Sequence, residues 1–342
     1  MNITVIVCTY NRSQSLANTL DSVARSILPA SVTWEVLVVD NNSSDQTREV
    51  VVDFCRRHPS RFRYLFEPQQ GKSYALNTGV RQARGEVLVF TDDDAIVDPH
   101  WLHNLTTALH NSQWAGVGGR VFRKWTCPPP SWLSVGRGYE KVGWALVSFD
   151  IGDEAGELAI PPVGANMAFR KEVFTRHGAF RTDLGPQGSE IGAPSGHKVE
   201  AERITRVYED TEFGRRLFFA GERLGYEPSA VVYHPVPEDR LTKKYFLSWW
   251  FGRGRGEILI TAERPALWGI PRRYVRMARM AAILLGRTLG WLLALKPCRR
   301  FYYKVLVWEM AGAIMEGYRQ WFGAGSQAPN LARARKVANP RG

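Results

Sequence analysis

Three consecutive aspartates, Asp92, Asp93 and Asp94, are the residues of this chain best suited to chemistry. They directly follow the apolar run at residues 87–91, which predicts a buried strand that delivers three carboxylates to the end of a sheet. Clustered like charges resist burial unless a cation or solvent compensates them. A divalent cation with oxygen ligands is the natural compensator. The triplet therefore predicts a metal site that acts on a phosphorylated substrate.

The elements that must position this triplet follow from the spacing of apolar residues. Short apolar runs alternate with helical patterns, and this order predicts an α/β fold with a mostly parallel sheet and helices on both faces. Ligands bind at the carboxyl edge of such sheets. Ser13 is expected to cap the first helix. Strands are expected at residues 3–9, 35–39, 62–66, 87–91, 163–169 and 230–233, and helices at residues 13–27, 50–54, 71–80, from 99 onward and at 210–220.

Polar and acidic segments end these strands or begin a late helix, and together they carry a resemblance. The segments are residues 9–12, 40–45, 91–94 and 208–212. In order and spacing they resemble the family 2 glycosyltransferases, which are inverting enzymes with a GT-A fold. The resemblance implies transfer of a sugar from a nucleotide-diphosphate sugar, above all a UDP-sugar, to an acceptor hydroxyl with the help of Mn²⁺ or Mg²⁺. The acceptor expected is a lipid-linked glycan or a cell-surface polysaccharide precursor.

The resemblance places the nucleotide at the ends of the first, second and fourth strands. Asp40 would accept a hydrogen bond from the base, and its alternative is a turn-forming aspartate. Lys72 resembles a Gly-Lys segment near the nucleotide, and its alternative is a solvated surface lysine. The expected nucleotide-binding residues are Thr9, Tyr10, Arg12, Asp40, Lys72, Asp92 and Asp93.

The triplet itself resembles the DxD signature, in which one carboxylate faces the ribose and another binds the metal. Because side chains alternate along a strand, Asp92 and Asp94 are expected on one face. Asp94 is the expected direct metal ligand, with Asp92 toward the ribose and the metal. His234, after the last strand, is expected to complete the metal site. A solvated acidic turn and a structural histidine are the alternatives.

Asp210 is the expected general base, which takes the proton of the acceptor hydroxyl. Glu209 is expected to orient Asp210 or to touch the acceptor. The alternative for Asp210 is a helix N-cap, because aspartate favours that position and a helix begins there. Thr211 is expected to share the capping.

Two weaker predictions concern the acceptor and the diphosphate. Asn166, in the small-residue segment 164–166, is expected on the acceptor side, with a tightly packed strand as the alternative. In residues 249–256, Trp250, Arg253 and Arg255 are expected near the diphosphate, and a basic loop on a membrane face is the alternative. Residues 181–206 are expected to form a lid. No QxxRW motif follows, which argues against a processive synthase.

Basic charge is concentrated at the C-terminal end of the chain. Residues 240–342 hold 20 Lys or Arg and 4 Asp or Glu, whereas the remainder holds 25 and 29, within a net charge of +12. We expect a catalytic domain over residues 1–235, with a nucleotide half (1–120) and an acceptor half (121–235), and a basic helical region over 236–342. Residues 280–321 predict either interfacial helices or a helical subdomain packed on the body. An anionic membrane is therefore the expected partner, and nucleic acid is not, because no binding motif for it is present.

The expected location is cytoplasmic, peripheral on the cytoplasmic face of the membrane. The chain enters a strand at once, so no signal peptide is expected, and its four cysteines form no CxxC pair. The alternative function is a non-catalytic module on a GT-A scaffold that binds a sugar nucleotide or a membrane. Intact Asp94 and Asp210 favour the enzyme.

Overall fold

The computed structural model describes residues 2–136, 138–186, 208–261 and 272–322 of the chain. The chain divides into two compact units, Met1–Trp249 and Trp250–Gly342, which are considered separately. Most of the segment expected to act as a lid lies outside the described residues, because residues 187–207 are not among them.

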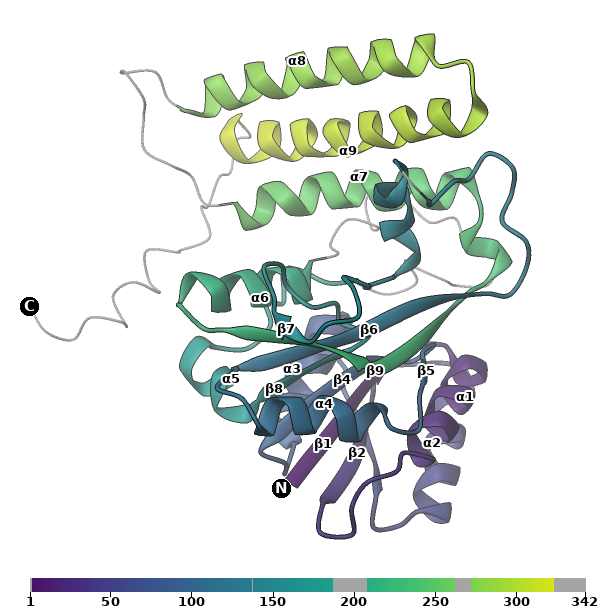
Figure 1. Ribbon diagram of the computed structural model, residues 1–342, viewed down its shortest axis with the longest axis vertical. Helices are drawn as coiled ribbons and strands as arrows, with labels where there is room; N and C mark the ends of the chain where they lie inside the picture. Colours follow the sequence, from purple (N-terminus) through teal and green to yellow (C-terminus); the bar gives the residue numbers. More distant parts are fainter. Residues whose placement is uncertain (1, 137, 187–207, 262–271, 323–342) are drawn as a thin grey trace, which may run out of the picture. The chain divides into compact units, whose positions relative to one another are not determined.

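The N-terminal part of the first unit is a parallel sheet whose strands alternate with helices (Figure 1). Its strands are β1 (Asn2–Thr9), β2 (Thr33–Asp40), β3 (Phe62–Phe66) and β4 (Val87–Asp92). The helices between them are α1 (Ser13–Ala24), α2 (Thr47–Arg57) and α3 (Lys72–Gln82). β1 pairs with β2 and β4, and β2 pairs with β3, all in parallel. β-Branched residues are frequent in β1, β2 and β4 because both faces of the sheet are covered there, and Val5, Val38 and Val89 are fully buried.

The order of these strands creates a crevice at the end of β1. The chain steps from β1 to β2 to β3 in one direction and then returns to place β4 on the other side of β1. Right-handed crossovers then put α1 and α2 on one face of the sheet and α3 on the other. At such a reversal the ligand crevice opens outside the carboxyl ends of the two flanking strands. Those ends are Thr9 of β1 and Asp92 of β4. The predicted fold class is therefore confirmed, and the acidic triplet lies at the carboxyl end of its strand as predicted.

Beyond β4 the sheet is mixed. β8 (Met167–Arg170) lies antiparallel between β4 and β6 (Gly116–Trp125), and β6 runs parallel to the long β9 (Leu224–Val236). Two short strands, β5 (Ile96–Val97) and β7 (Gly156–Glu157), pair with β9. The remaining elements of this unit are α4 (Trp101–His110), η1 (Glu140–Leu146), α5 (Lys171–His177), α6 (Glu209–Phe219) and η2 (Glu238–Arg240).

Glycine and proline residues make two of these strands, β6 and β9, hard to predict from the pattern of apolar residues. β6 was not predicted because it begins Gly-Val-Gly-Gly, yet a Cβ at Gly116 would lie 2.2 Å from the Phe169 ring. The close approach of β8 therefore demands glycine. β9 was predicted only over residues 230–233, since Pro228 interrupts the apolar pattern. The β6–β9 register shifts between Gly119 and Arg120, and this bulge accommodates the interruption.

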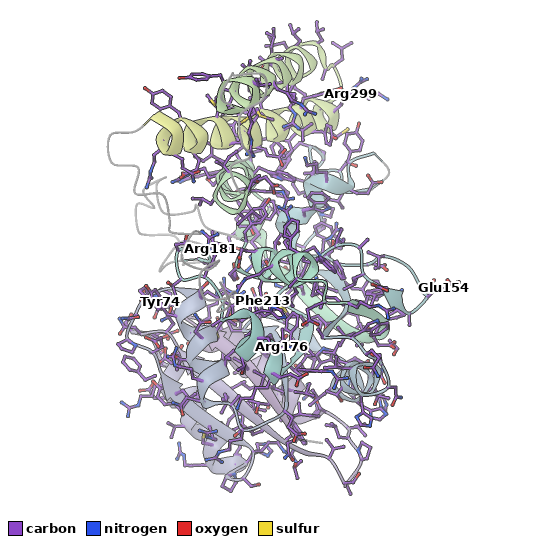
Figure 2. All side chains as sticks on the ribbon, turned by 90° about the vertical axis from the view of Figure 1, so that its left-hand side faces the viewer. Tyr74, Glu154, Arg176, Arg181, Phe213 and Arg299 are labelled. Carbon is purple, nitrogen blue, oxygen red and sulfur yellow. The ribbon has the colours of Figure 1, made fainter. Side chains whose placement is uncertain are left out.

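Aromatic packing fixes α6 on the sheet. Phe213, labelled in Figure 2, lies with its ring centroid 5.1 Å from that of Phe169 and 4.8 Å from those of Phe174 and Phe180. The four rings are buried in the main core. Rings at these distances contribute about 0.5–1.5 kcal/mol per pair beyond the burial of their surface. The first turn of α6, which carries Glu209 and Asp210, is thereby held at the edge of the sheet.

The second unit is helical. α7 (Lys243–Ile260) begins in the first unit and continues into the second, where α8 (Arg272–Leu293) and α9 (Pro297–Phe322) follow. The helical prediction for residues 280–321 is confirmed. The basic-loop alternative for residues 249–256 is wrong, because those residues lie within α7. Among the described residues, no helix has both the length and the apolar character that crossing a bilayer requires.

Two glycines explain why a glycine-rich stretch is helical here. A Cβ at Gly254 of α7 would lie 1.8 Å from the carbonyl oxygen of Glu309 in α9, and one at Gly312 would lie 2.1 Å from that of Phe251. The helices therefore cross backbone to backbone. Glycine costs about 1 kcal/mol in a helix interior, and close packing offsets this cost.

This crossing predicts opposite effects for two glycine substitutions. Gly254→Ala should lower the free energy of unfolding by about 2 kcal/mol or more, because its methyl group has no room. Gly286→Ala, on α8 with no atom within 4 Å of its Cβ, should raise it by roughly 0.5–1 kcal/mol. Urea unfolding of the full chain measures both. Equal effects of the two substitutions would contradict the close crossing.

Candidate functional site

Asp92, Asp94 and His234 come together at the carboxyl end of β4. One ligand atom from each lies within 4.8 Å of the others. His234 Nε2 is 3.1 Å from Asp94 Oδ1 and 3.9 Å from Asp92 Oδ2. The other ring nitrogen, Nδ1, is 3.2 Å from the Pro235 carbonyl oxygen. With a metal bound, a proton on Nδ1 directed at that carbonyl would leave the Nε2 lone pair for the metal, so the three side chains fit a divalent cation.

The chain after β4 explains this meeting. β4 ends at Asp92, and residues 93 and 94 form a turn rather than a continued strand. β5 follows at once and pairs Ile96 with Tyr233, the neighbour of His234. The turn thus brings Asp94 back beside Asp92. The predicted proximity of the two aspartates is seen, but the predicted cause, alternation along an extended strand, is wrong.

Two arginines compensate the triplet on its other side. Arg12, the residue before α1, donates through Nη1 to Asp93 Oδ1 at 2.9 Å and to Asp94 Oδ2 at 3.0 Å. Arg240 of η2 donates through Nη2 to the same Asp94 oxygen at 2.6 Å. Burial alone would raise the pKa of Asp94, but His234, Arg240 and Arg12 hold it well below its usual range. Burial raises the pKa of Asp93 although Arg12 opposes the shift.

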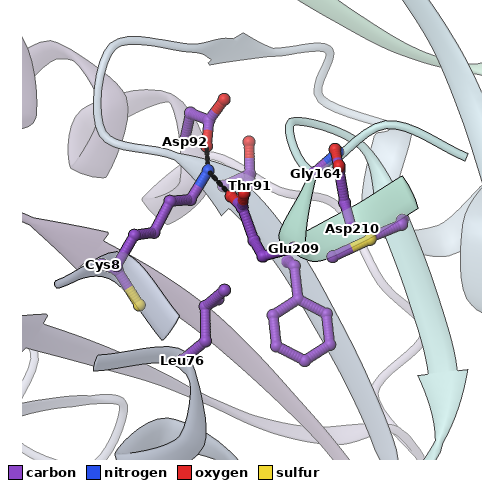
Figure 3. A pocket seen from close by; sticks show the side chains of 10 residues that line it. Cys8, Leu76, Thr91, Asp92, Gly164, Glu209 and Asp210 are labelled. Atoms are coloured by element: carbon purple, nitrogen blue, oxygen red, sulfur yellow. Dashed lines mark hydrogen bonds and ion pairs between the residues drawn. The ribbon is translucent and has the colours of Figure 1, made fainter. Parts of the chain in front are cut away.

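Lys72 links the triplet to the first turn of α6. Its Nζ is 2.9 Å from Asp92 Oδ1 and 3.3 Å from Glu209 Oε1. Burial alone would lower the pKa of Lys72, but Asp92 and Glu209 raise it well above its usual range. The surface-lysine alternative is therefore wrong. Figure 3 shows the small pocket that these side chains share, which is lined by Cys8, Lys72, Leu76, Phe90, Thr91, Asp92, Gly164, Met167, Glu209 and Asp210.

Asp210 lies across the pocket from Asp92 and is held by backbone (Figure 3). Its Oδ2 accepts a hydrogen bond from the Gly164 N–H at 2.8 Å, and its Oδ1 accepts one from the Thr211 N–H at 2.6 Å. The N-cap of α6 is Tyr208, with φ 117°, so the N-cap alternative for Asp210 is wrong. Glu209 is buried beside it, and burial raises the pKa of Glu209 against the effect of Lys72. The acidic first turn of α6 also lies at the positive end of the helix dipole.

Asp40 is buried at the end of β2, in register with Thr9 of β1. It accepts hydrogen bonds from the Ser43 N–H at 2.9 Å and from the Tyr64 hydroxyl at 2.8 Å. The turn alternative therefore describes part of its role, since the carboxylate shapes the loop after β2. An ionised carboxylate has about four acceptor sites, so capacity remains for a ligand. Tyr10 is half-buried beside Thr9.

Helix α1 begins without the predicted serine cap. The N-cap residue is Arg12, and the Ser13 N–H donates to the Asp45 carboxylate at 2.9 Å. Asp45, from the loop after β2, therefore takes the place that Ser13 was expected to fill. The same contact joins the loops that follow β1 and β2.

The residues predicted to contact the acceptor and the diphosphate do not line the pocket that contains Asp92 and Asp210. Asn166 is fully buried, and its amide donates to the carbonyls of Arg120 and Ala230 while accepting from the Trp101 ring N–H. It fastens β8 to β6, β9 and α4. In the second unit, Trp250 is fully buried, Arg253 Nε is 3.6 Å from Glu309, and Arg255 donates to Glu316 at 2.9 Å. The expected contacts of these residues with substrate stay predictions.

Arg240, Gly164 and Tyr64 belong to the site but were missed or given no role in it. Arg240 ends the short η2 after β9, in a segment with no recognisable motif, and its separation of 146 residues from Asp94 leaves no local signal. Gly164 lies in the small-residue segment 164–166, and the sequence pattern does not indicate that its N–H donates to Asp210. The parallel register of β2 and β3 pairs Asp40 with Phe66 and Val38 with Tyr64. Because side chains two residues apart in a strand lie on one face, Tyr64 is on the same face as Asp40 and reaches it diagonally.

Comparison with known proteins identifies the class. Residues 4–178 match the family described as "Glycosyl transferase family 2". The glucosyl-dolichyl phosphate glucuronosyltransferase of Haloferax volcanii is 30% identical over 261 residues, 74% of this chain and 75% of the relative. The succinoglycan biosynthesis protein ExoM of Rhizobium meliloti is 26% identical over 77% of this chain and 76% of its own.

Solved structures agree on the fold. The mannosyltransferase PcManGT of Pyrobaculum calidifontis, in complex with GDP-Man and Mn²⁺, superposes with a TM-score of 0.53 at 22% identity, covering 98% of this chain and 80% of that one. Fold and site together define a glycosyltransferase with a GT-A architecture. The chain belongs to glycosyl transferase family 2. This membership favours the enzyme over the non-catalytic module.

The Arg240–Asp94 ion pair predicts a direct effect on metal affinity. Arg240→Met should raise the affinity for Mn²⁺ in the absence of nucleotide by about tenfold, because a positive charge no longer repels the cation at Asp94. Titration calorimetry of the apoprotein measures this. Arg223→Met, which removes an exposed pair with Glu157, is the matched control. Unchanged or weaker Mn²⁺ binding in Arg240→Met would show that Arg240 does not compete with the cation for Asp94.

Proposed function

We propose that this chain is an inverting glycosyltransferase that moves a sugar from a nucleotide-diphosphate sugar to an acceptor hydroxyl in a single displacement. One observation carries the proposal. Lys72 joins Asp92 to Glu209, the neighbour of Asp210, and Asp92 and Asp210 line one pocket. Asp92 also belongs, with Asp94 and His234, to the metal-type cluster. Transfer from a diphosphate needs both a charge partner for the leaving group and an acceptor of the attacking proton.

The donor side is proposed to lie along the ends of β1, β2 and β4. Asp92, Asp94 and His234 would hold Mn²⁺ or Mg²⁺, which supplies positive charge to the diphosphate. Asp40, with Thr9 and Tyr10, would face the base, and Asp92 and Asp93 the ribose. Arg12 and Arg240 hold Asp93 and Asp94 in place and add positive charge at this edge. We propose a UDP-sugar, and the GDP-Man bound to PcManGT supports the donor class while leaving the nucleotide to experiment.

Asp210 is the proposed general base. Hydrogen bonds from Gly164 and Thr211 fix its carboxylate and leave acceptor capacity for a substrate hydroxyl. As the acceptor oxygen forms its bond to the anomeric carbon, the bond from that carbon to the diphosphate oxygen breaks. The hydroxyl proton passes to Asp210. Attack opposite the leaving group inverts the anomeric centre, so an α-linked donor gives a β-linked product.

The proposed acceptor is a lipid-linked glycan or a polysaccharide precursor. The name of the Haloferax relative specifies a glucosyl-dolichyl phosphate acceptor, and that of ExoM specifies succinoglycan biosynthesis. A lipid-linked acceptor would require access to a membrane surface. We therefore propose a peripheral position on the cytoplasmic face of the membrane.

A thermal-shift screen of nucleotide sugars with Mn²⁺, Mg²⁺ or EDTA tests the donor proposal. One nucleotide-diphosphate sugar should raise the melting temperature only when a divalent cation is present, because ligand that binds the native state stabilises it. No shift with any nucleotide sugar, or the same shift in EDTA, would count against the proposed donor and cofactor.

Asp210→Asn tests the general base. Turnover, measured as nucleoside diphosphate released from the selected donor with acceptor present, should fall about a thousandfold. Donor affinity should stay within about threefold, since the metal-type cluster is untouched. Glu212→Gln, in the same helical turn and paired with Arg216, is the matched control. Full turnover in Asp210→Asn would remove Asp210 from its role.

Gly164→Ala tests the positioning of that base. Its Cβ would lie 3.3 Å from Asp210 Oδ2 and 3.6 Å from Lys72 Nζ, so the carboxylate must shift by a few tenths of an ångström. We expect kcat to fall roughly tenfold. Gly156→Ala, with no atom within 4 Å of its Cβ, is the control. Equal kcat in the two variants would mean that Asp210 needs no such positioning.

A further inference from the structure

Helix α8 presents a continuous apolar face to solvent. Leu285 is 63% exposed, Leu289 50% and Leu292 61%, and they recur at spacings of four and three residues. Tyr274 and Val275 extend the face to the start of the helix, and Leu293 and Leu295 extend it past the end. Isolated exposed apolar residues are ordinary, but a contiguous row marks a surface that binds something.

The other side of α8 is engaged within the helical unit. Arg287 donates to the Leu306 carbonyl at 2.9 Å and to Glu309 at 3.2 Å, both in α9. Trp291 and Trp308 meet edge to face at 6.2 Å. Figure 1 shows α8 and α9 side by side. A different face of α8 already packs against α9, so the exposed row does not serve the contact between these two helices.

Positive charge accompanies the exposed row. From Arg264 to Trp308 the sequence contains ten Lys or Arg and no Asp or Glu. Of the described residues, Arg279 is exposed on α8, and Lys296, Arg299 and Arg300 are exposed directly after it. Arg299 is labelled in Figure 2. An amphipathic helix with leucines on one face and cations at its margins is the type that lies in the interface of an anionic bilayer.

We propose that the exposed α8 face, formed by Tyr274, Val275, Leu285, Leu289, Leu292 and Leu293, docks on an anionic phospholipid surface with α8 parallel to the membrane plane. The leucines would enter the acyl boundary while Lys296, Arg299 and Arg300 meet lipid phosphates. A second copy of the chain fits this face less well. Pairing two copies through it would bring exposed cations together, with no exposed acidic residue on α8 to match them.

Sedimentation with phospholipid vesicles tests the proposal without donor or acceptor, so its result is independent of glycosyl transfer. The full chain should bind vesicles of phosphatidylcholine with phosphatidylglycerol and bind phosphatidylcholine alone weakly. The double variant Leu285→Gln/Leu289→Gln should bind the anionic vesicles at least roughly tenfold more weakly than the parent. Phe219→Gln, which removes a 91% exposed aromatic side chain from α6 of the first unit, is the matched control and should bind like the parent.

The variant Arg299→Gln/Arg300→Gln tests the charge separately and should weaken binding to anionic vesicles about thirtyfold. Circular dichroism checks that each variant is folded. If the leucine variant does not fold, the arginine variant still tests the proposal. Equal vesicle binding by parent, leucine and arginine variants would overturn the proposal. So would a parent that binds no vesicle and sediments as a dimer that Leu285→Gln/Leu289→Gln dissociates, because a second copy would then cover this face.

Discussion

Repulsion among carboxylates at the carboxyl end of β4 is the constraint on which the rest of the site depends. Asp92, Asp93, Asp94 and Glu209 lie within one small region, and two of them are buried. Such a cluster persists only where cations compensate it. Lys72, Arg12 and Arg240 supply that compensation through ion pairs of 2.6–3.3 Å.

The compensating cations come from separate parts of the first unit, and this arrangement couples site to fold. Lys72 begins α3, Arg12 precedes α1, and Arg240 lies in η2 after β9. The loops after β1 and β3 bring Arg12 and Lys72 to this edge, where the strand order reverses. Arg240 follows the end of β9, which pairs with β5 directly after the triplet. The same contacts give each side chain a defined place: Lys72 spans from the metal-type cluster to α6, whose first turn holds the proposed base.

The pattern of apolar residues along the chain was sufficient to predict the part of the fold in which strands and helices alternate regularly. The apolar runs of β1, β2, β3 and β4 predicted the parallel sheet, and the polar or acidic residues at the ends of β1, β2 and β4 predicted a candidate site at its carboxyl edge. The pattern failed where tertiary contact decides the residue type. β6 needs glycine beside Phe169, and α7 needs Gly254 beside α9, so their sequences resemble loops. Arg240 and the N–H of Gly164 had no signal at all, because only the folded chain brings them to Asp94 and Asp210.

The central claim is that the carboxylate cluster binds a nucleotide diphosphate through a divalent cation. Titration calorimetry of UDP and GDP into the full chain, with Mn²⁺ and then with EDTA, tests it most directly. We expect one nucleotide to bind at least about tenfold more tightly with Mn²⁺, and Asp94→Asn to remove this difference. Binding of equal strength in EDTA, or an unaltered Mn²⁺ effect in Asp94→Asn, would contradict binding of the diphosphate through a cation at this cluster.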